Sequence, residues 1–210
     1  MRMRCGKIVC VGQNYREHIK ELNNDEPAEP VLFLKPPSSI IADGEEIIVP
    51  AGIGAVHHEV ELALIIGRRA KDVLPHEALR HVRSVAVFND VTAREMQSTA
   101  RKAGMPWALS KGMDSFAPLG APVPLRDVED VHCLDLELSV NGKLRQKGNT
   151  GQMIFPPEVL ISYISRFMTL ESGDVIATGT PSGVGPLNDG DVVEAKISGI
   201  GKLTNKVRAL

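Results

Sequence analysis

The sequence predicts a mixed α+β fold that is rich in β-strands. Apolar runs of strand length recur along the 210 residues, 19 glycines and 14 prolines punctuate them, and few segments have helical periodicity. Many short strands with few helices are typical of a mixed β-roll with helices outside, and not of a doubly wound sheet. The length favours one domain with a sizeable core, so we expect residues 1–210 to form a single domain.

In the N-terminal half, strands are predicted at KIVCV, VLFLKP, EEIIVP, EVELALIIG and SVAVFND. A short helix is expected at 14–22, followed by a polar loop at 23–30. Another helix is expected at PHEALRHV, where Pro75 suits a first turn. The segment TAREMQSTARKAG predicts a third helix, capped by Thr92 and ended by Gly104.

In the C-terminal half, LDLELSVNGKLRQ alternates with period two around Asn141-Gly142, which predicts a hairpin with a type I′ turn. The segment PPEVLISYISRFMTL predicts an amphipathic helix with proline in its first turn. The last strands are expected at DVIATG, DVVEAKI and KLTNKVRA, and the Gly-rich segment GTPSGVGP is expected to form a loop between two of them.

Charge and cysteine content limit the classes of partner and compartment. The 24 Lys and Arg nearly balance the 26 Asp and Glu, so neither nucleic acid nor a membrane is expected as a partner. Cys5, Cys10 and Cys133 are odd in number and lack C-x-x-C spacing, which argues against a disulfide framework or a zinc site. We therefore expect a reducing, cytoplasmic location, consistent with the absence of a signal-peptide pattern or a long apolar run.

A candidate metal site lies in the segment HHEVELALIIG. On a strand, Glu59 and Glu61 point to the same face, roughly 6.7 Å apart along the backbone. Asp90 ends a second apolar strand, and ligands often lie at strand ends. Three carboxylates together would repel by about 4 kcal/mol per pair at ~4 Å, a cost that a divalent cation removes. Oxygen ligands suit Mg²⁺ or Mn²⁺, with Ca²⁺ possible and Zn²⁺ less natural.

Other interpretations of this segment remain open from the residues alone. The two glutamates could lie on a solvent-facing strand edge with no shared ligand. His57 has the parity of the glutamates and could support the site from behind, whereas His58 points the other way. Either histidine could equally be a hydrogen-bonded residue of the core or its rim.

Four motifs together give the chain a resemblance to a known family. HHEVELALIIG, VFNDVTAREMQ, LSKGMDSFAPLG and TGTPSGVG, in this order and spacing, closely resemble the fumarylacetoacetate hydrolase family, and the similarity covers nearly the whole chain from about Lys7. The resemblance implies the family's mixed β-sheet roll with a few outer helices, as one catalytic domain. It implies that Glu59, Glu61 and Asp90 are the metal ligands. Larger relatives supply a further acidic ligand that has no counterpart here, so water or substrate would complete the coordination.

The resemblance also implies catalytic roles. VGQNYREHIKEL is similar to a segment that forms a short N-terminal lid helix in short family members and carries a catalytic pair, here His18 and Glu21. Their i, i+3 spacing places both on one helix face, so Glu21 can orient His18 as a general base toward water. The same segment also suits a solvated helix face with paired charges. We expect this polar lid to be mobile without ligand and to close over the substrate.

Further site residues follow from the same motifs. Lys111 matches a family lysine that contacts the substrate, although alone it would be assigned to the surface. Arg94 and Gln97 lie one turn apart after Asp90 and could bind substrate. Thr180 lies in the Gly-rich loop, whose backbone amides could bind an anion, although a plain turn is equally compatible.

These roles imply a metal-dependent hydrolase or lyase that cleaves or decarboxylates a small 2-oxo acid, such as an acylpyruvate or oxaloacetate, through a metal-stabilised enolate. One alternative is an isomerase or decarboxylase of a 2-hydroxy-diene-dioate, or an oxaloacetate keto–enol tautomerase. A non-enzymatic alternative is a metal-stabilised module that binds a small acid. The resemblance further implies a homodimer, with VLFLKP and FAPLGAPVPL as candidate interface strands.

Overall fold

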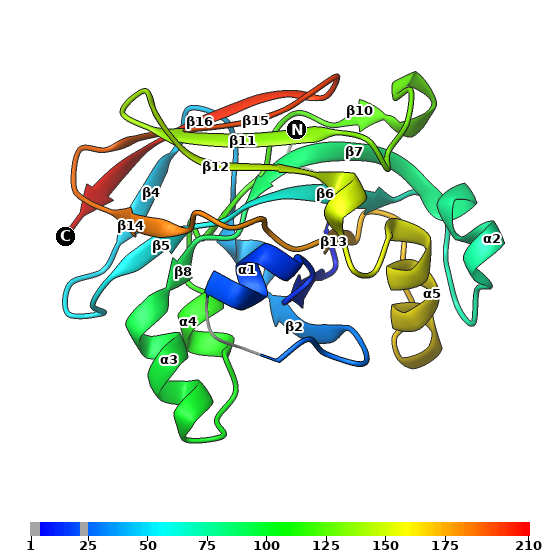
Figure 1. The fold of residues 1–210 in the computed structure, drawn as a ribbon, viewed down its shortest axis with the longest axis horizontal. Helices are drawn as coiled ribbons and strands as arrows, with labels where there is room; N and C mark the ends of the chain where they lie inside the picture. Colours follow the sequence, from blue (N-terminus) through cyan, green and yellow to red (C-terminus); the bar gives the residue numbers. More distant parts are fainter. Residues whose placement is uncertain (1–4, 22–24) are drawn as a thin grey trace.

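The computed structural model describes residues 5–21 and 25–210, and it has the predicted strand-rich α+β fold. Two large sheets pack face to face, and the helices lie outside them (Figure 1). The C-terminus lies at the outside of this arrangement (Figure 1).

The six-stranded sheet has the order β10-β7-β6-β13-β1-β2. Its strands are β1 (Ile8–Gly12), β2 (Val31–Lys35), β6 (Val60–Ile66), β7 (Val82–Asn89), β10 (Val123–Pro124) and β13 (Val175–Ala177). Only the β1–β13 pair is parallel, and β6 pairs antiparallel with both β7 and β13. The sheet is therefore mixed, as predicted.

The five-stranded sheet has the order β12-β11-β15-β16-β4. Its strands are β4 (Glu46–Val49), β11 (Asp135–Val140), β12 (Lys143–Asn149), β15 (Val192–Ile197) and β16 (Gly201–Ala209). Smaller sheets are formed by β14 (Gly185–Leu187), β5 (Val56–His58) and β8 (Thr92–Ala93), and by β3 (Ile40–Ile41) and β9 (Ala117–Pro118).

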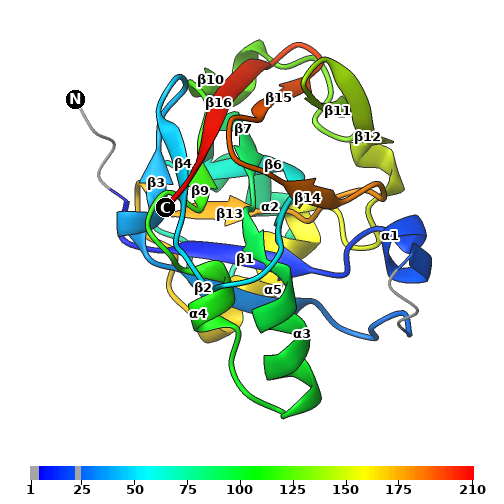
Figure 2. The same cartoon turned by 90° about the vertical axis from the view of Figure 1, so that its left-hand side faces the viewer.

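The α-helices are α1 (Arg16–Glu21), α2 (Pro75–Ala78), α3 (Arg94–Lys102), α4 (Ala108–Lys111) and α5 (Pro157–Phe167). Single 3₁₀ turns occur at η1 (Pro37–Ser39), η2 (Leu79–His81), η3 (Leu125–Asp127) and η4 (Thr150–Gln152). Helices α2 and α5 lie together at one end, while α3 and α4 project at the other (Figures 1 and 2). Among the described residues, no helix is long and apolar enough to cross a membrane.

Strand β6 is buried along its whole length because both of its faces pack against protein. Val60, Leu62 and Leu64 face the large core that the two sheets share, whereas Ala63 and Ile65 face a second, smaller core. Each fully buried aliphatic side chain contributes about 1.5–3 kcal/mol. The alternation of β6 therefore places Glu61, which has the parity of Ala63, at the edge of the smaller core.

The turn predictions are confirmed, and one capping prediction is wrong. Asn141 and Gly142 both have positive φ (52° and 73°), as a type I′ turn requires, and Gly104 follows α3 with φ 66°. Thr92 does not cap α3. It lies in β8, and its hydroxyl donates to the Asp90 carbonyl at 2.8 Å. The hydroxyl therefore bonds to the backbone two residues before it and not to an amide of α3.

The predicted helix at 14–22 is observed as α1, Arg16–Glu21. Leu22 and the start of the predicted loop at Asn23 lie outside the described residues. The two candidate interface segments differ in burial, and their role in an interface stays a prediction. Phe116 and Ala117 are fully buried within the chain itself, so FAPLGAPVPL contributes to the monomer core. In contrast, β2 is an edge strand and its Leu34 is exposed.

Candidate metal and catalytic centre

Three carboxylates meet where β6 begins and β7 ends, as the strand parity predicts. The oxygens of Glu59, Glu61 and Asp90 that could bind a metal ion all lie within 4.8 Å of one another. The three residues are 4%, 2% and 0% exposed. The alternative of two glutamates on a solvent-facing strand edge is therefore wrong.

Local hydrogen bonds hold the carboxylates together. The Asp90 amide donates to the Glu59 carbonyl at 2.8 Å, and the Glu59 amide donates to the Asn89 side chain at 2.9 Å. The carboxylate of Glu61 accepts a hydrogen bond from the Gly179 amide at 2.8 Å. The end of the β6–β7 pair and the Gly-rich loop together fix the cluster.

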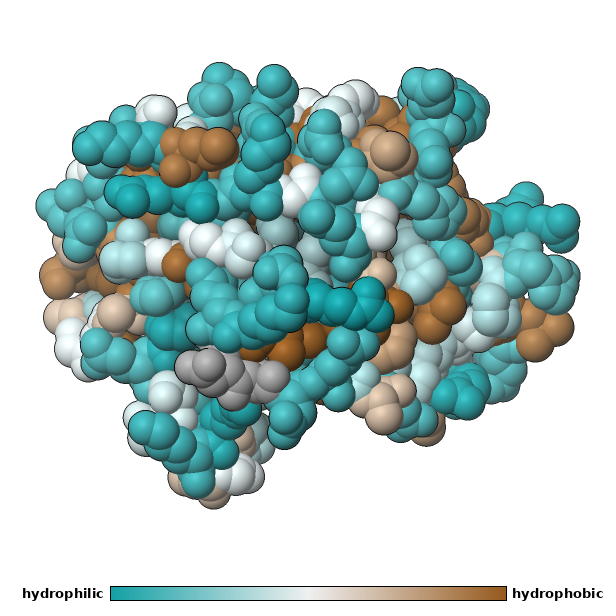
Figure 3. Space-filling model, in the orientation of Figure 1, coloured by the Kyte–Doolittle hydropathy of each residue, from teal (hydrophilic) through white to brown (hydrophobic). Residues whose placement is uncertain are grey.

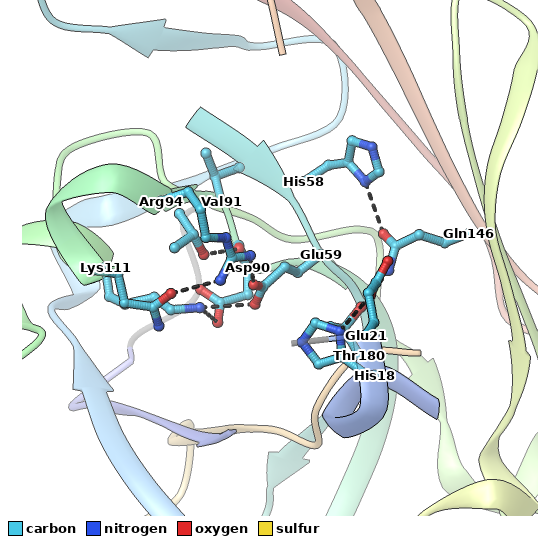
Figure 4. A network of polar contacts seen from close by, with 12 residues as sticks. His18, Glu21, His58, Glu59, Asp90, Val91, Arg94, Lys111, Gln146 and Thr180 are labelled. Carbon is cyan, nitrogen blue, oxygen red and sulfur yellow. Dashed lines mark hydrogen bonds and ion pairs between the residues drawn. The ribbon is translucent and has the colours of Figure 1, made fainter. Parts of the chain in front are cut away.

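Cationic side chains contact this cluster, two of them buried and one partly buried (Figure 4). The Lys111 ammonium lies 2.8 Å from Glu59 Oε2 and 2.6 Å from Asp90 Oδ2. Lys35 forms a buried ion pair with Asp90, and Arg94 forms an ion pair with Glu59. Lys111 is 2% exposed, so it is not the surface lysine that its position in the sequence alone would indicate. Three cations thus stand against three carboxylates.

The three carboxylates do not receive equal compensation from these cations. Burial alone would raise the pKa of Glu59, but the Lys111 ammonium and the Arg94 guanidinium hold that pKa well below its usual range. Burial raises the pKa of Glu61 well above its usual value, and the nearby Asp90 and Glu59 carboxylates raise it further. Within the described residues, Glu61 has no ion pair of its own.

A divalent metal ion fits this cluster. The Glu61 carboxyl is buried and points at two other carboxylates without a cation of its own, which is an unfavourable arrangement unless a cation joins it. The candidate ligands are all oxygen atoms, which suits Mg²⁺ or Mn²⁺ and allows Ca²⁺. Glu59, Glu61 and Asp90 would hold the ion, and they leave coordination positions for water or substrate.

Helix α1 places His18 beside the carboxylate cluster, in a cavity that both line, and Glu21 is hydrogen-bonded to His18. His18 Nδ1 lies 3.0 Å from Glu21 Oε2, so a proton on Nδ1 leaves the Nε2 lone pair free to act as a base. The other oxygen of Glu21 accepts a hydrogen bond from the Gly183 amide at 3.0 Å. The Gly-rich loop thus supports Glu61 through Gly179 and Glu21 through Gly183.

The lid helix has more apolar anchorage than its polar sequence indicates. Tyr15 is 1% exposed and Ile19 is 4% exposed, and both pack inward. Buried Asn14 also bonds to Thr178 and Phe155 through its side chain. The expectation of little apolar surface under this segment is therefore wrong, because Tyr15 just before α1 and Ile19 within it are both buried. Motion of the lid stays a prediction, and residues 22–24 lie outside the described part.

A cavity of about 320 Å³ joins these groups. Glu21 does not line the cavity, but it is hydrogen-bonded to His18, which does. The other predicted site residues all line it, namely His18, Glu59, Glu61, Asp90, Arg94, Gln97, Lys111 and Thr180. Arg94 also donates to the Gln97 side chain at 2.6 Å, so the first turn of α3 is ordered against the carboxylate cluster.

The Thr180 hydroxyl is used to support the site. It donates to the Val60 carbonyl at 2.8 Å and accepts from the Gln146 amide at 2.8 Å. The Gln146 carbonyl oxygen accepts from His58 at 2.9 Å, so His58 is a hydrogen-bonded core residue. His57 is partly buried, and its Nδ1 has no partner among the described residues.

Sequence reasoning missed several residues that contact the carboxylate cluster or line the cavity. Lys35 closes the apolar strand VLFLK, and an ionisable residue at the end of such a strand is the signal that could have identified it. Phe33 and Trp107 form an edge-to-face pair on the cavity wall, with ring centroids 5.6 Å apart. Ser98 and Arg101 continue the α3 face that carries Arg94 and Gln97.

Comparisons with known proteins agree with this geometry. A family model described as fumarylacetoacetate hydrolase C-terminal matches residues 7–208. A mitochondrial oxaloacetate tautomerase of Arabidopsis thaliana is 50% identical, over 94% of this chain and 88% of its own length. A mitochondrial oxaloacetate decarboxylase of Dictyostelium discoideum is 46% identical, over 92% of this chain and 89% of its own.

A solved structure gives the same result. Fumarylpyruvate hydrolase of Pseudomonas aeruginosa, in complex with Mn²⁺ and pyruvate, matches with a TM-score of 0.95 and 33% identity, over 100% of this chain and 92% of its own. The fold and the carboxylate-lined cavity define the class, an enzyme built on a strand-rich α+β domain. More particularly, the chain belongs to the fumarylacetoacetate hydrolase family.

Proposed function

We propose that this enzyme cleaves or decarboxylates a small 2-oxo acid with the help of Mg²⁺ or Mn²⁺ held by Glu59, Glu61 and Asp90. One observation carries the proposal. The carboxylate cluster, the buried Lys111 and His18, which is hydrogen-bonded to Glu21, line one cavity. The relatives named oxaloacetate decarboxylase and fumarylpyruvate hydrolase act on acids of this class, which supports it.

Charge explains why the cavity would take an anion. Lys35, Lys111 and Arg94 already offset the three carboxylates. A bound divalent ion would add two positive charges and, as a Lewis acid, would polarise the 2-oxo group. An anionic headgroup then compensates the excess charge in a site where solvent screening is weak. Lys111, at the centre of the cluster, is placed to hold negative charge that develops on the substrate oxygen.

For hydrolysis of an acylpyruvate, His18 and Glu21 supply the base. The hydrogen bond from Nδ1 to Glu21 directs Nε2 into the cavity, where it can take a proton from water. The Glu21 carboxylate then stabilises the imidazolium that forms. Decarboxylation of oxaloacetate needs no activated water, so it should depend less on this pair.

A second candidate function is keto–enol tautomerisation of oxaloacetate. The relative named oxaloacetate tautomerase shares half of its residues with this chain, which favours it. Tautomerisation also requires the same charge stabilisation at the 2-oxo oxygen, with a proton moved at the neighbouring carbon. The cavity as described is compatible with both chemistries.

The remaining features of the proposal concern assembly and location. We propose one catalytic domain, a cytoplasmic location and a homodimer. The free thiols of Cys5, Cys10 and Cys133 suit a reducing compartment. Edge strand β2 with exposed Leu34 offers a surface on which a second copy could dock.

A substrate panel tests the proposal. Acetylpyruvate, fumarylpyruvate and oxaloacetate would be supplied with Mg²⁺, with Mn²⁺ and after metal removal, and loss of the enol absorbance and release of pyruvate followed. We expect metal-dependent turnover of at least one acid. Pyruvate release from oxaloacetate separates decarboxylation from tautomerisation, which changes the absorbance without producing pyruvate. No turnover of any acid with either metal would contradict the proposal.

A further inference from the structure

One face of α3 lines the cavity from its inner end to its mouth. Arg94, Gln97, Ser98 and Arg101 all lie on it, with the i, i+3, i+4, i+7 spacing of a single helix face. Helix α3 runs away from the sheets (Figures 1 and 2), so Arg101 lies toward its outer end. Seven residues correspond to about 10.5 Å along the helix axis. The cavity thus has an arginine at each end of this helix face.

Arg94 and Arg101 differ in whether a carboxylate compensates their charge. Arg94 forms an ion pair with Glu59 and donates to Gln97 at 2.6 Å, so its charge is already compensated. Arg101 is exposed and forms no ion pair with any residue in 5–21 or 25–210. Hydrophilic side chains cover the projecting α3 at the lower left of the molecule (Figure 3). The Arg101 charge therefore remains available to a ligand.

Among the described residues that line the cavity between these arginines, none is acidic apart from the carboxylate cluster. Its walls there are Gln97 and Ser98 on α3 and the Phe33–Trp107 edge-to-face pair opposite. Neutral and apolar walls suit the carbon chain of a ligand. The uncompensated guanidinium farther out suits a carboxylate at the end of that chain.

We propose that Arg101 binds a second carboxylate and so makes the enzyme selective for 2-oxo dicarboxylic acids over 2-oxo acids with an apolar tail. The inference rests on the proposed function, because it takes the 2-oxo headgroup to lie at the carboxylate cluster. It adds the substrate class and a residue that determines it. Arg101 acts in binding and lies far from the cluster, so its removal should change KM and leave kcat almost unchanged.

Binding of unreactive acids tests the inference without turnover. The probes are 2-oxoadipate and 2-oxohexanoate, which have equal chain length and differ by a terminal carboxylate in place of a methyl group. Their affinities would be measured by calorimetry in the presence of Mn²⁺. The variants are Arg101→Met and, as a matched control, Lys102→Met. Lys102 is the next residue of the same helix, is also exposed and does not line the cavity.

We expect the wild type to bind 2-oxoadipate about 10-fold more tightly than 2-oxohexanoate. A preference of this size lies between the effect of an exposed ion pair and the effect of a buried hydrogen bond to a charged group. Arg101→Met should abolish the preference by weakening 2-oxoadipate alone, and Lys102→Met should retain it. Arg101→Lys should recover part of it. Equal affinity for both acids in the wild type, or a preference that survives Arg101→Met, would overturn the inference.

Turnover gives a second readout. The KM for fumarylpyruvate should rise about 10-fold in Arg101→Met with kcat retained, while acetylpyruvate kinetics stay as in the wild type. An equal loss on both acids would show that Arg101 has no role in recognising the tail. If the wild type neither binds nor turns over any of these acids, both the proposed function and this inference fail. Binding without a preference overturns only the inference.

Discussion

The Lys111 ammonium lies 2.6 Å from Asp90 Oδ2, and both residues are buried. Burial disfavours a charged lysine, but the carboxylates of Asp90 and Glu59 raise the pKa of Lys111 above its usual value. Lys111 is therefore charged at neutral pH. It neutralises the same carboxylates to which a metal ion would bind, so Lys111 and a bound metal ion would both stabilise this cluster.

Replacing Lys111 by methionine should make the metal-free protein much less stable. The variant keeps the volume but leaves three buried carboxylates with only two cations, Lys35 and Arg94, which costs about 3 kcal/mol. Mn²⁺ should restore part of this loss because it offsets the same charges. Urea unfolding with and without Mn²⁺ would measure both effects, and the Mn²⁺-induced gain should be larger in the variant than in the wild type.

The control for this comparison is Lys206→Met, at an exposed position of β16 remote from the cluster. Its free energy of unfolding should stay within about 0.5 kcal/mol of the wild type. An equal Mn²⁺-induced gain in Lys111→Met and wild type would show that Lys111 and the metal ion do not share the carboxylates.

Gln146 should be important for stability although it lies outside the cavity. Its amide accepts from His58 and the Val60 amide and donates to Thr180 and the Pro181 carbonyl. Gln146→Leu leaves these buried groups unpaired and should lower the free energy of unfolding by about 2 kcal/mol or more. The exposed neighbour offers a control, since Lys147→Leu should cost about 0.5 kcal/mol at most. A similar cost for both variants in urea unfolding would refute the argument.

The His132 cluster should give the stability a pH dependence. Partial burial opposes its charge, but hydrogen bonds to Glu158 and Asp130, each 3.0 Å, raise the pKa of His132 above its usual value. Because the pKa is raised in the folded state, protonated His132 stabilises the fold fully at pH values below the usual histidine pKa of about 6.5. This contribution is lost as the pH rises through the raised pKa.

The stability difference between wild type and His132→Gln should therefore be largest at acid pH and should shrink as pH rises through the raised pKa. Urea midpoints measured from pH 5 to 9 would check it, and a difference that grows with pH would contradict it.

The sheets could be predicted because their signals are local. The alternation around Asn141-Gly142 specifies both strands and the turn, and the parity of Glu59 and Glu61 specifies which face of β6 they share. The prediction that Thr92 caps α3 was wrong because a threonine hydroxyl can bond either to an amide of the following helix or to a preceding backbone carbonyl. In the folded chain it bonds to the Asp90 carbonyl.

The cavity could be predicted only in part. Glu59, Glu61 and Asp90 were recognisable from residue type and spacing, and His18 and Lys111 from the family resemblance. Lys35 was missed because its partner Asp90 is 55 residues away, and the two residues meet only in the folded chain, where β2 and β7 are not neighbouring strands. Arg101 was missed because seven residues separate it from Arg94, and nothing in the sequence indicates that one helix face extends along the cavity.

His18→Ala should separate the reactions that need activated water from those that do not. The imidazole is ordered by Glu21 and is not among the candidate metal ligands, so Mn²⁺ affinity should be nearly unchanged. Acylpyruvate hydrolysis should fall by roughly 10²-fold or more, the usual contribution of a general base. Oxaloacetate decarboxylation should fall less, because its carbon–carbon cleavage needs an electron sink and no activated water. Steady-state rates and calorimetric Mn²⁺ titration would measure these effects.

Two further variants of α1 complete this test. Glu21→Gln can keep the hydrogen bond from the Gly183 amide but loses the charge that stabilises the imidazolium. It should therefore slow acylpyruvate hydrolysis more than oxaloacetate decarboxylation. Glu17→Ala removes an exposed charge that pairs only with Lys20 among the described residues, and it should leave every rate unchanged. Wild-type hydrolysis by His18→Ala would remove the general-base assignment. Loss of Mn²⁺ binding would instead make His18 a metal ligand and require a different ligand set.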